Sequence, residues 1–176
     1  LQKALELYTK SAEQGYVPAQ CNVGYCYYTG IGTEENNEEA VKWFTLAAEQ
    51  QYPRAQFLLG ECWLNGYGVE KDPAKAVEYF QAAAEQGYPQ AQCDLGWCFE
   101  RGIGVAQDTQ KAVELYRQSA EQGHTPAQCN LGTCYYSSIG VEEDNEEAVK
   151  WFTLAAEQKY PRAQFLLGEC WVNGYG

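Results

Sequence analysis

The sequence has little positive charge. It contains 12 lysine and arginine residues against 24 aspartate and glutamate residues, which gives a formal net charge of −12 in 176 residues. Nucleic acid and anionic membrane both select a positive surface, so we expect neither to be a partner. The acidic surface instead favours basic protein partners, because opposite charges speed the encounter of two molecules.

Long apolar runs are also missing. No stretch approaches the ~20 apolar residues that a membrane-spanning helix needs, and the start does not resemble a signal peptide. The composition is 45% hydrophobic, which argues against disorder. The chain begins at Leu1 and ends at Gly176 in the middle of a repeating pattern, so we expect a fragment of a longer protein.

Histidine is nearly absent. His124 is the only one, whereas zinc sites and Ser–His–Asp or Cys–His nucleophiles draw on histidine in a defined geometry. Acidic clusters at 34–39 and 142–148 lack the glycine-hinged spacing of a calcium loop. They suit the start of a helix, where carboxylates favour the dipole. We therefore predict no enzyme activity, no metal and no cofactor.

No Cys-x-x-Cys motif occurs, although the chain has eight cysteines. Six of them form three pairs at an offset of five residues: Cys21 and Cys26, Cys93 and Cys98, and Cys129 and Cys134. On a helix this offset turns the side chains ~140° apart and separates the backbones too far for a bridge. We expect free thiols, which are typical of a reducing compartment and favour a cytoplasmic protein.

The sequence does contain a repeat with a period of 36 residues. The motif AQCNVGYCYYTGIG at 19–32 returns as AQFLLGECWLNGYG at 55–68, and so on along the chain. The central glycines of the five copies are Gly24, Gly60, Gly96, Gly132 and Gly168. A longer period overlies this one, because residues 1–68 match 109–176 with only 14 differences. The fourth repeat therefore copies the first, and the fifth copies the second.

Each repeat is predicted to form two helices. The first begins near a proline such as Pro53, has an apolar face at helical spacing, and ends at a glycine pair such as Gly30-x-Gly32, where the left-handed conformation follows the last turn. Ser138 replaces the first glycine of this pair in the fourth copy, and if the left-handed conformation is kept there, this should cost about 1 kcal/mol. The second helix is expected to start after one of four N-cap residues: Asn36, Asp72, Asp108 and Asp144. Glu39 and Glu147 complete capping boxes there.

The pattern predicts an all-α protein, an α/α solenoid of about ten helices in one array. One helix pair cannot bury its apolar face alone, but stacked pairs can. The expected segments are a trailing helix at 1–14, repeats at 18–50, 53–86, 89–122 and 125–158, and the first helix of a fifth repeat at 161–176. Neither end has a polar capping repeat, so each exposes a hydrophobic flank. We expect a monomer or weak end-to-end association.

The motif A-x3-[LV]-G-x2-[YWF]-x2-G-x-G, followed by [KE]-A-[VL]-x2-[WY]-[FY] and A-[AS]-E-Q-G, resembles the Sel1-like repeat family. This family is related to the tetratricopeptide repeats, and the resemblance covers essentially all of the chain. It implies a right-handed solenoid whose first helices line a concave face, and a role as an adaptor that assembles protein complexes. A cysteine-rich secreted branch of the family, with reported β-lactam binding, has a disulfide at the end of each second helix. Here these ends read A-A-E-Q or S-A-E-Q, without cysteine.

The resemblance places a set of aromatic and charged side chains on the concave face. This predicted partner-binding set is Tyr25, Tyr28, Arg54, Phe57, Glu61, Gln90, Trp97, Glu100, Arg101, Tyr136, Arg162, Phe165 and Glu169. Such residues suit a peptide groove, because rings give contact area at low entropy cost and arginine gives directed hydrogen bonds. We expect Tyr25 and Trp97 to be exposed, while Phe57 and Phe165 either line the groove or pack between helices.

Two other sets recur at fixed positions. The aromatics Tyr27, Trp63, Phe99, Tyr135 and Trp171 are predicted to be core, because they occupy one register. Three cysteines, Cys21, Cys93 and Cys129, are predicted to face the groove and to be reachable, whereas Cys26 and its copies are predicted to be buried.

The function favoured by these observations is a protein–protein interaction scaffold that binds a peptide or partner segment on its concave face. Two alternatives remain. The segment is a structural spacer within a larger repeat protein, or, less in keeping with the residues, a hydrolase-like or β-lactam-binding repeat protein. A spacer should tolerate mutations in the groove, and a hydrolase should react with a covalent probe.

Overall fold

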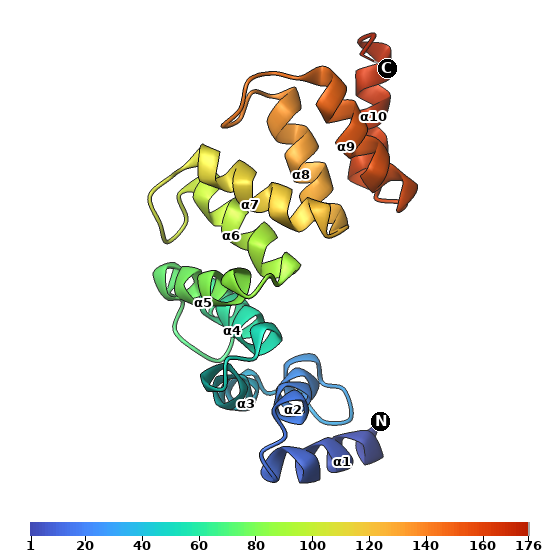
Figure 1. The fold of residues 1–176 in the computed structure, drawn as a ribbon. Helices are drawn as coiled ribbons and strands as arrows, with labels where there is room; N and C mark the ends of the chain where they lie inside the picture. Colours follow the sequence, from blue (N-terminus) through green and yellow to red (C-terminus); the bar gives the residue numbers. More distant parts are fainter. Residues whose placement is uncertain (176) are drawn as a thin grey trace. The chain divides into compact units, whose positions relative to one another are not determined.

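In the computed structural model, which describes residues 1–175, the chain forms ten α-helices and no strand (Figure 1). The helices are α1 (Gln2–Glu13), α2 (Val17–Thr29), α3 (Asn37–Glu49), α4 (Pro53–Asn65), α5 (Pro73–Glu85), α6 (Pro89–Arg101), α7 (Thr109–Glu121), α8 (Thr125–Tyr136), α9 (Asn145–Glu157) and α10 (Pro161–Val172). The predicted all-α repeat solenoid is confirmed. The last residue of the segment predicted at 161–176 lies outside the described residues.

The helices belong to two compact units. Unit 1 is Leu1–Gln86 and contains α1 to α5; unit 2 is Gly87–Gly176 and contains α6 to α10. In each unit, helices that follow one another in the chain pack side by side, as expected of a stacked repeat. No helix within residues 1–175 is long and apolar enough to cross a bilayer.

The first helix of each repeat has the predicted boundaries. Proline occupies one of the first two positions of α2, α4, α6, α8 and α10. Gly30 and Gly66 end α2 and α4 in the left-handed conformation, with φ of 70° and 81°. Ser138 keeps this conformation with φ of 54°, which is the condition under which the sequence predicts strain at the fourth copy.

The second helices have the predicted N-caps but not the full capping boxes. Asn36 Oδ1 accepts the backbone N–H of Glu39 at 3.0 Å, and the other three caps do the same in their repeats. The reciprocal bond from Glu39 is absent, because the Asn36 N–H donates instead to the Tyr27 carbonyl at 2.9 Å. Glu39 pairs with Lys42, and Glu147 likewise pairs with Lys150. Each loop thus ties the end of one helix to the start of the next.

The strictly repeated glycines are explained by close packing of the two helices in a repeat. A Cβ atom on Gly24 would lie 2.7 Å from the ring of Phe44, and one on Gly132 would lie 2.7 Å from the ring of Phe152. Real Cβ atoms do not approach other atoms so closely. Both rings are fully buried. On α10, a Cβ on Gly168 would meet nothing within 4 Å.

A row of glutamine pairs joins the helices across each repeat. Gln50 Nε2 donates to Gln20 Oε1 at 2.8 Å, and Gln158 Nε2 donates to Gln128 Oε1 at 2.8 Å. The other two pairs are Gln86 with Gln56 and Gln122 with Gln92. In each pair the first-helix glutamine is buried and its second-helix partner is exposed, and a buried amide that is paired helps to specify one packing arrangement. The sequence signal was the strict recurrence of A-Q in first helices and E-Q in second helices.

The predicted aromatic core is correct at only one position. Phe99 is buried. The rings of Tyr27, Trp63 and Tyr135 are half-buried and pack against the outside of the core clusters. Trp171 is 67% exposed, because no helix of the described chain covers that side of α10.

The cysteines are free thiols, as predicted, and all eight are buried. The prediction that Cys21, Cys93 and Cys129 are reachable was wrong. Their small side chains lie in the helix interfaces, and burial raises the pKa of Cys21 to about 11 and of Cys93 to about 12. These thiols therefore remain protonated and are poor nucleophiles at neutral pH.

Candidate functional site

The predicted partner-binding residues all lie on first helices, and we call the surfaces that they form the first-helix faces of the two units. In unit 1 the residues are Tyr25, Tyr28, Arg54, Phe57 and Glu61, on α2 and α4. In unit 2 they are Gln90, Trp97, Glu100, Arg101, Tyr136, Arg162, Phe165 and Glu169, on α6, α8 and α10. Particular side chains join successive first helices, as Arg54 of α4 joins Asn22 of α2 and Arg162 of α10 joins Asn130 of α8.

In unit 1, an arginine is held between two side chains of the preceding first helix. Arg54 Nη1 donates to Asn22 Oδ1 at 3.1 Å, and the Arg54 guanidinium carbon lies 5.2 Å from the centre of the Tyr25 ring. Tyr25 was predicted to be exposed and is half-buried. The guanidinium contacts an amide and a ring rather than a carboxylate, although the protein is acidic.

Tyr28 forms the second part of the unit 1 face. Its ring centre lies 5.9 Å from that of Tyr67 and 6.2 Å from that of Phe44. Burial, and then the nearby Glu61 carboxylate, raise the pKa of the Tyr28 hydroxyl to about 12. A pocket of about 270 Å³ opens beside Tyr28 and Tyr67 and is also lined by Glu35 and Asn37.

The two phenylalanines of the predicted set differ. Phe57 is half-buried, with its ring centre 5.9 Å from that of Phe80, so it packs between helices. Phe165 is 65% exposed at the same register of α10.

Gln90 contributes a side-chain carbonyl oxygen that is buried and has no hydrogen-bond partner among the described residues.

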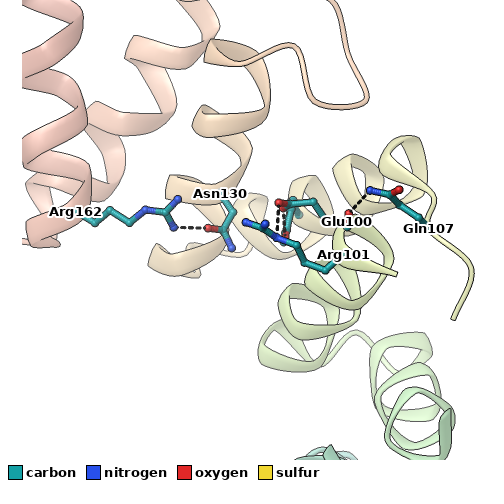
Figure 2. Close-up of polar contacts among 6 residues, drawn as sticks. Glu100, Arg101, Gln107, Asn130 and Arg162 are labelled. Carbon is teal, nitrogen blue, oxygen red and sulfur yellow. Dashed lines mark hydrogen bonds and ion pairs between the residues drawn. The ribbon is translucent and has the colours of Figure 1, made fainter. Parts of the chain in front are cut away.

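In unit 2, Arg162 repeats the amide contact of Arg54. Its Nη1 donates to Asn130 Oδ1 at 2.9 Å (Figure 2). Thr133 stands where the matching ring would be, and Arg162 is exposed. The duplicated site therefore keeps its hydrogen bond and loses its aromatic contact.

Glu100 is the centre of a polar network that occurs only in the third repeat among the described residues. Its carboxylate pairs with Arg101 Nε at 3.2 Å, and its carbonyl accepts a hydrogen bond from Gln107 Nε2 at 2.8 Å (Figure 2). The carboxylate also accepts a hydrogen bond from the hydroxyl of Tyr116 at 2.8 Å. Burial and the Glu100 charge raise the pKa of Tyr116. Tyr116 was missed at the sequence level; the signal was a tyrosine where the other repeats have Phe44, Phe80 and Phe152. A cavity of about 560 Å³ adjoins Glu100 and Arg101 and reaches Ser138.

Trp97 and Asp94 stand one helical turn apart on α6. Trp97 is 39% exposed, which confirms its predicted exposure. Asp94 is half-buried, and desolvation raises the pKa of its carboxyl group to about 6. Asp94 was also missed at the sequence level; the signal was an aspartate at the register of Asn22 and Asn130.

The groups that the sequence singled out for possible metal or acid–base chemistry lie outside the helices that carry the first-helix faces. No cluster of three or more histidine, cysteine or acidic residues in residues 1–175 is arranged to hold a metal ion. His124 is the N-cap residue of α8, where burial lowers its pKa.

The Sel1 repeat model matches residues 1–16, 17–52, 53–88, 89–124 and 125–160. The chain belongs to the Sel1 repeat family. Sel1 repeat proteins are generally protein-interaction scaffolds, and their solenoid fold is typically non-catalytic. Among curated proteins no match was found.

Several solved Sel1 repeat structures are similar to this chain. A protective antigen of uropathogenic Escherichia coli strains that displays an SLR fold is 38% identical, with a TM-score of 0.92, over 97% of this chain and 36% of the antigen. The chain thus spans about a third of that antigen. A Sel1 repeat protein from Oxalobacter formigenes is 34% identical, with a TM-score of 0.86, over 97% of this chain and 70% of that protein. Helicobacter pylori cysteine-rich protein B is 25% identical, with a TM-score of 0.57, over 72% and 94% of the two chains.

Proposed function

We propose that this Sel1 repeat chain is an adaptor whose first-helix faces bind a peptide or an extended segment of a protein partner. The observation that carries the proposal is the combination of exposed rings and oriented guanidinium groups at matching positions. Trp97 and Phe165 expose large rings, and Asn22 and Asn130 orient Arg54 and Arg162. Aromatic and arginine side chains dominate the binding energy of protein interfaces.

The charge of the chain supports a basic partner. The formal net charge is −12, so a basic segment would be attracted from solution, most strongly at low ionic strength. This charge also argues against nucleic acid and anionic membrane as partners. A hydrolase-like or β-lactam-binding role has little support, because the thiols are buried and the one histidine has no acid partner positioned with it in the described chain.

A peptide-display selection tests the proposal. The selection compares the parent protein with a variant in which Trp97, Phe165 and Arg162 are changed to alanine. A matched control carries Leu46→Ala and Leu154→Ala, which remove exposed leucines from second helices. We expect to select peptides that bind the parent and the control but do not bind the triple alanine variant, which we call the face variant.

The other outcomes decide between the alternatives. Equal enrichment on the parent and a folded face variant would move the binding surface away from the first helices. No enrichment on any of the three proteins would favour a structural spacer. Circular dichroism and thermal unfolding establish that the variants are folded, which separates lost binding from lost structure.

A further inference from the structure

Unit 1 contains a complete arginine-binding arrangement within one chain. Asn22 and Tyr25 lie one turn apart on α2, and Arg54 reaches them from α4. The amide oxygen accepts a hydrogen bond, and the ring faces the guanidinium, which is a cation–π contact. The arginine stands 32 residues after the asparagine that accepts its bond.

The third repeat has a stronger version of the same acceptor pair on α6. Asp94 occupies the register of Asn22, and Trp97 occupies the register of Tyr25. A carboxylate adds an opposite charge and can accept two parallel N–H bonds from a guanidinium, neither of which a neutral amide oxygen offers, and tryptophan is the best of the aromatic cation–π partners.

The arginine that would fill this acceptor pair is missing from the chain. The residue 32 positions after Asp94 is Pro126, on α8 in the same unit. Proline has neither a charged side chain nor a backbone N–H. Asp94 makes none of the ion pairs found in the described chain, which are Lys42–Glu39, Arg101–Glu100 and Lys150–Glu147.

The fourth repeat shows that the geometry persists in unit 2. Arg162 still donates to Asn130 at 2.9 Å although Thr133 has replaced the ring. A guanidinium group therefore reaches this register by its hydrogen bond alone, and the register of Asp94 lies one repeat earlier on the same face.

We propose that Asp94 and Trp97 form a receptor for an arginine side chain of the protein partner. The partner supplies the guanidinium group that Arg54 and Arg162 supply within the chain at the corresponding positions. This inference rests on the proposed binding function and names the partner as a basic, arginine-bearing segment. The net charge of −12 favours such a segment, and the raised pKa of Asp94, caused by burial alone, is expected of a carboxylate without a neighbouring cation.

The receptor is tested by nuclear magnetic resonance on the whole labelled chain. The probes are the N-acetyl N-methylamides of arginine, citrulline and lysine. Citrulline has the shape of arginine without its charge. We expect arginine to shift the indole N–H signal of Trp97, assigned by its loss in Trp97→Thr, about tenfold more than citrulline at equal concentration, and more than lysine, which lacks the planar fork.

Substitutions taken from the sibling repeats sharpen the test. Asp94→Asn, which copies Asn22 and Asn130, should reduce the shift about tenfold. The double variant Thr125→Pro with Pro126→Arg copies the start of α4. It should abolish the shift of the Trp97 signal, because the introduced arginine occupies the receptor. The matched control, Thr125→Pro with Pro126→Gln, copies the start of α6 and should keep the parent response. Equal shifts with arginine and citrulline, or equal responses of the two position-126 variants, would overturn the proposal.

The outcome can be separated from that of the proposed function. If display yields peptides that need the first-helix face but bind equally well after arginine is replaced by citrulline, the arginine receptor is wrong and the peptide-binding face stands. If the arginine probe binds at Trp97 while display yields nothing, the receptor stands and a peptide-binding role fails.

Discussion

The first-helix face of unit 1 and that of unit 2 come from one repeat and differ at a few side chains. In unit 1 Arg54 closes over Tyr25 and Asn22, so the chain satisfies its own acceptors. In unit 2 Asp94 and Trp97 present the same kind of acceptors without an arginine. The comparison indicates how a repeat protein gains specificity: the backbone fixes the register, and a change at one position turns an internal contact into a binding surface.

The largest expected effect tests whether the duplicated copies pack alike. Gly24→Ala in unit 1 and Gly132→Ala in unit 2 place a methyl group against a buried ring. Each should lower the free energy of unfolding by about 1–3 kcal/mol, the usual range for overpacking. Chemical denaturation measures both.

Gly168→Ala is the control for this pair, since nothing lies near its added methyl group. Alanine favours a helix over glycine by about 1 kcal/mol, so this variant should be unchanged or slightly more stable. A loss in one copy but not in its duplicate would mean that the two copies do not pack alike.

The second prediction concerns the charge that distinguishes unit 2. The folded pKa of Asp94, about 6, lies above the ordinary value of 3.8, so ionised Asp94 disfavours the folded state above pH 6. This penalty fades as the pH falls from 6 toward 3.8, and below 3.8 both states hold the proton. Asp94→Asn should therefore raise the free energy of unfolding by about 1–2 kcal/mol at pH 8 and by little at pH 4.

Binding should have the opposite dependence on pH. Arginine binding at Trp97 needs the ionised carboxylate, so it should weaken as the pH falls through 6, and Asp94→Asn should remove that dependence. Denaturation and indole titrations at several pH values measure the two effects. A pH-independent stability difference between parent and variant would contradict the prediction.

The third prediction uses the glycine that the fourth repeat has lost. Ser138 holds φ at 54° where the first repeat has Gly30 at 70°. Ser138→Gly should stabilise the protein by about 1 kcal/mol because strain at a left-handed position is relieved. Gly30→Ser should cost a similar amount, and the two variants together should cancel in thermal unfolding. A gain from Gly30→Ser would contradict the explanation.

The smallest effect concerns the aromatic contact that separates the two arginines. Arg54→Ala removes a hydrogen bond and a cation–π contact, whereas Arg162→Ala removes the hydrogen bond alone. Arg54→Ala should therefore cost about 0.5–1 kcal/mol more, the value of a partly exposed cation–π pair. Thr133→Tyr, which restores the ring in unit 2, should bring the two costs together in denaturation measurements. Equal costs in the parent background would show that the ring contributes nothing.

The sequence predicted local structure well and burial less well. Helix boundaries depend on residues next to one another, such as Pro53 at the start of α4 and Gly66 at its end, so they can be read from the chain.

Exposure did not follow from register alone, because Trp97 is exposed as predicted whereas Tyr25, at the same register, is half-buried beneath Arg54. Cys21 and Trp171 were assigned to the wrong surroundings, because their burial depends on how far neighbouring helices approach and whether a neighbour is present.

What the sequence alone determined is the repeat: its period of 36, its two helices, its caps and the family to which the chain belongs. These features rest on contacts within a few residues, repeated often enough to be unmistakable. The tertiary structure decided which side chains from different repeats share a site. Only the placement of α4 beside α2 links Arg54 to Asn22 and Tyr25. The proposal for Asp94, Trp97 and Pro126 depends on comparison with that contact. The physical reason is that the hydrogen bond spans two helices, at a spacing fixed by packing rather than by local sequence.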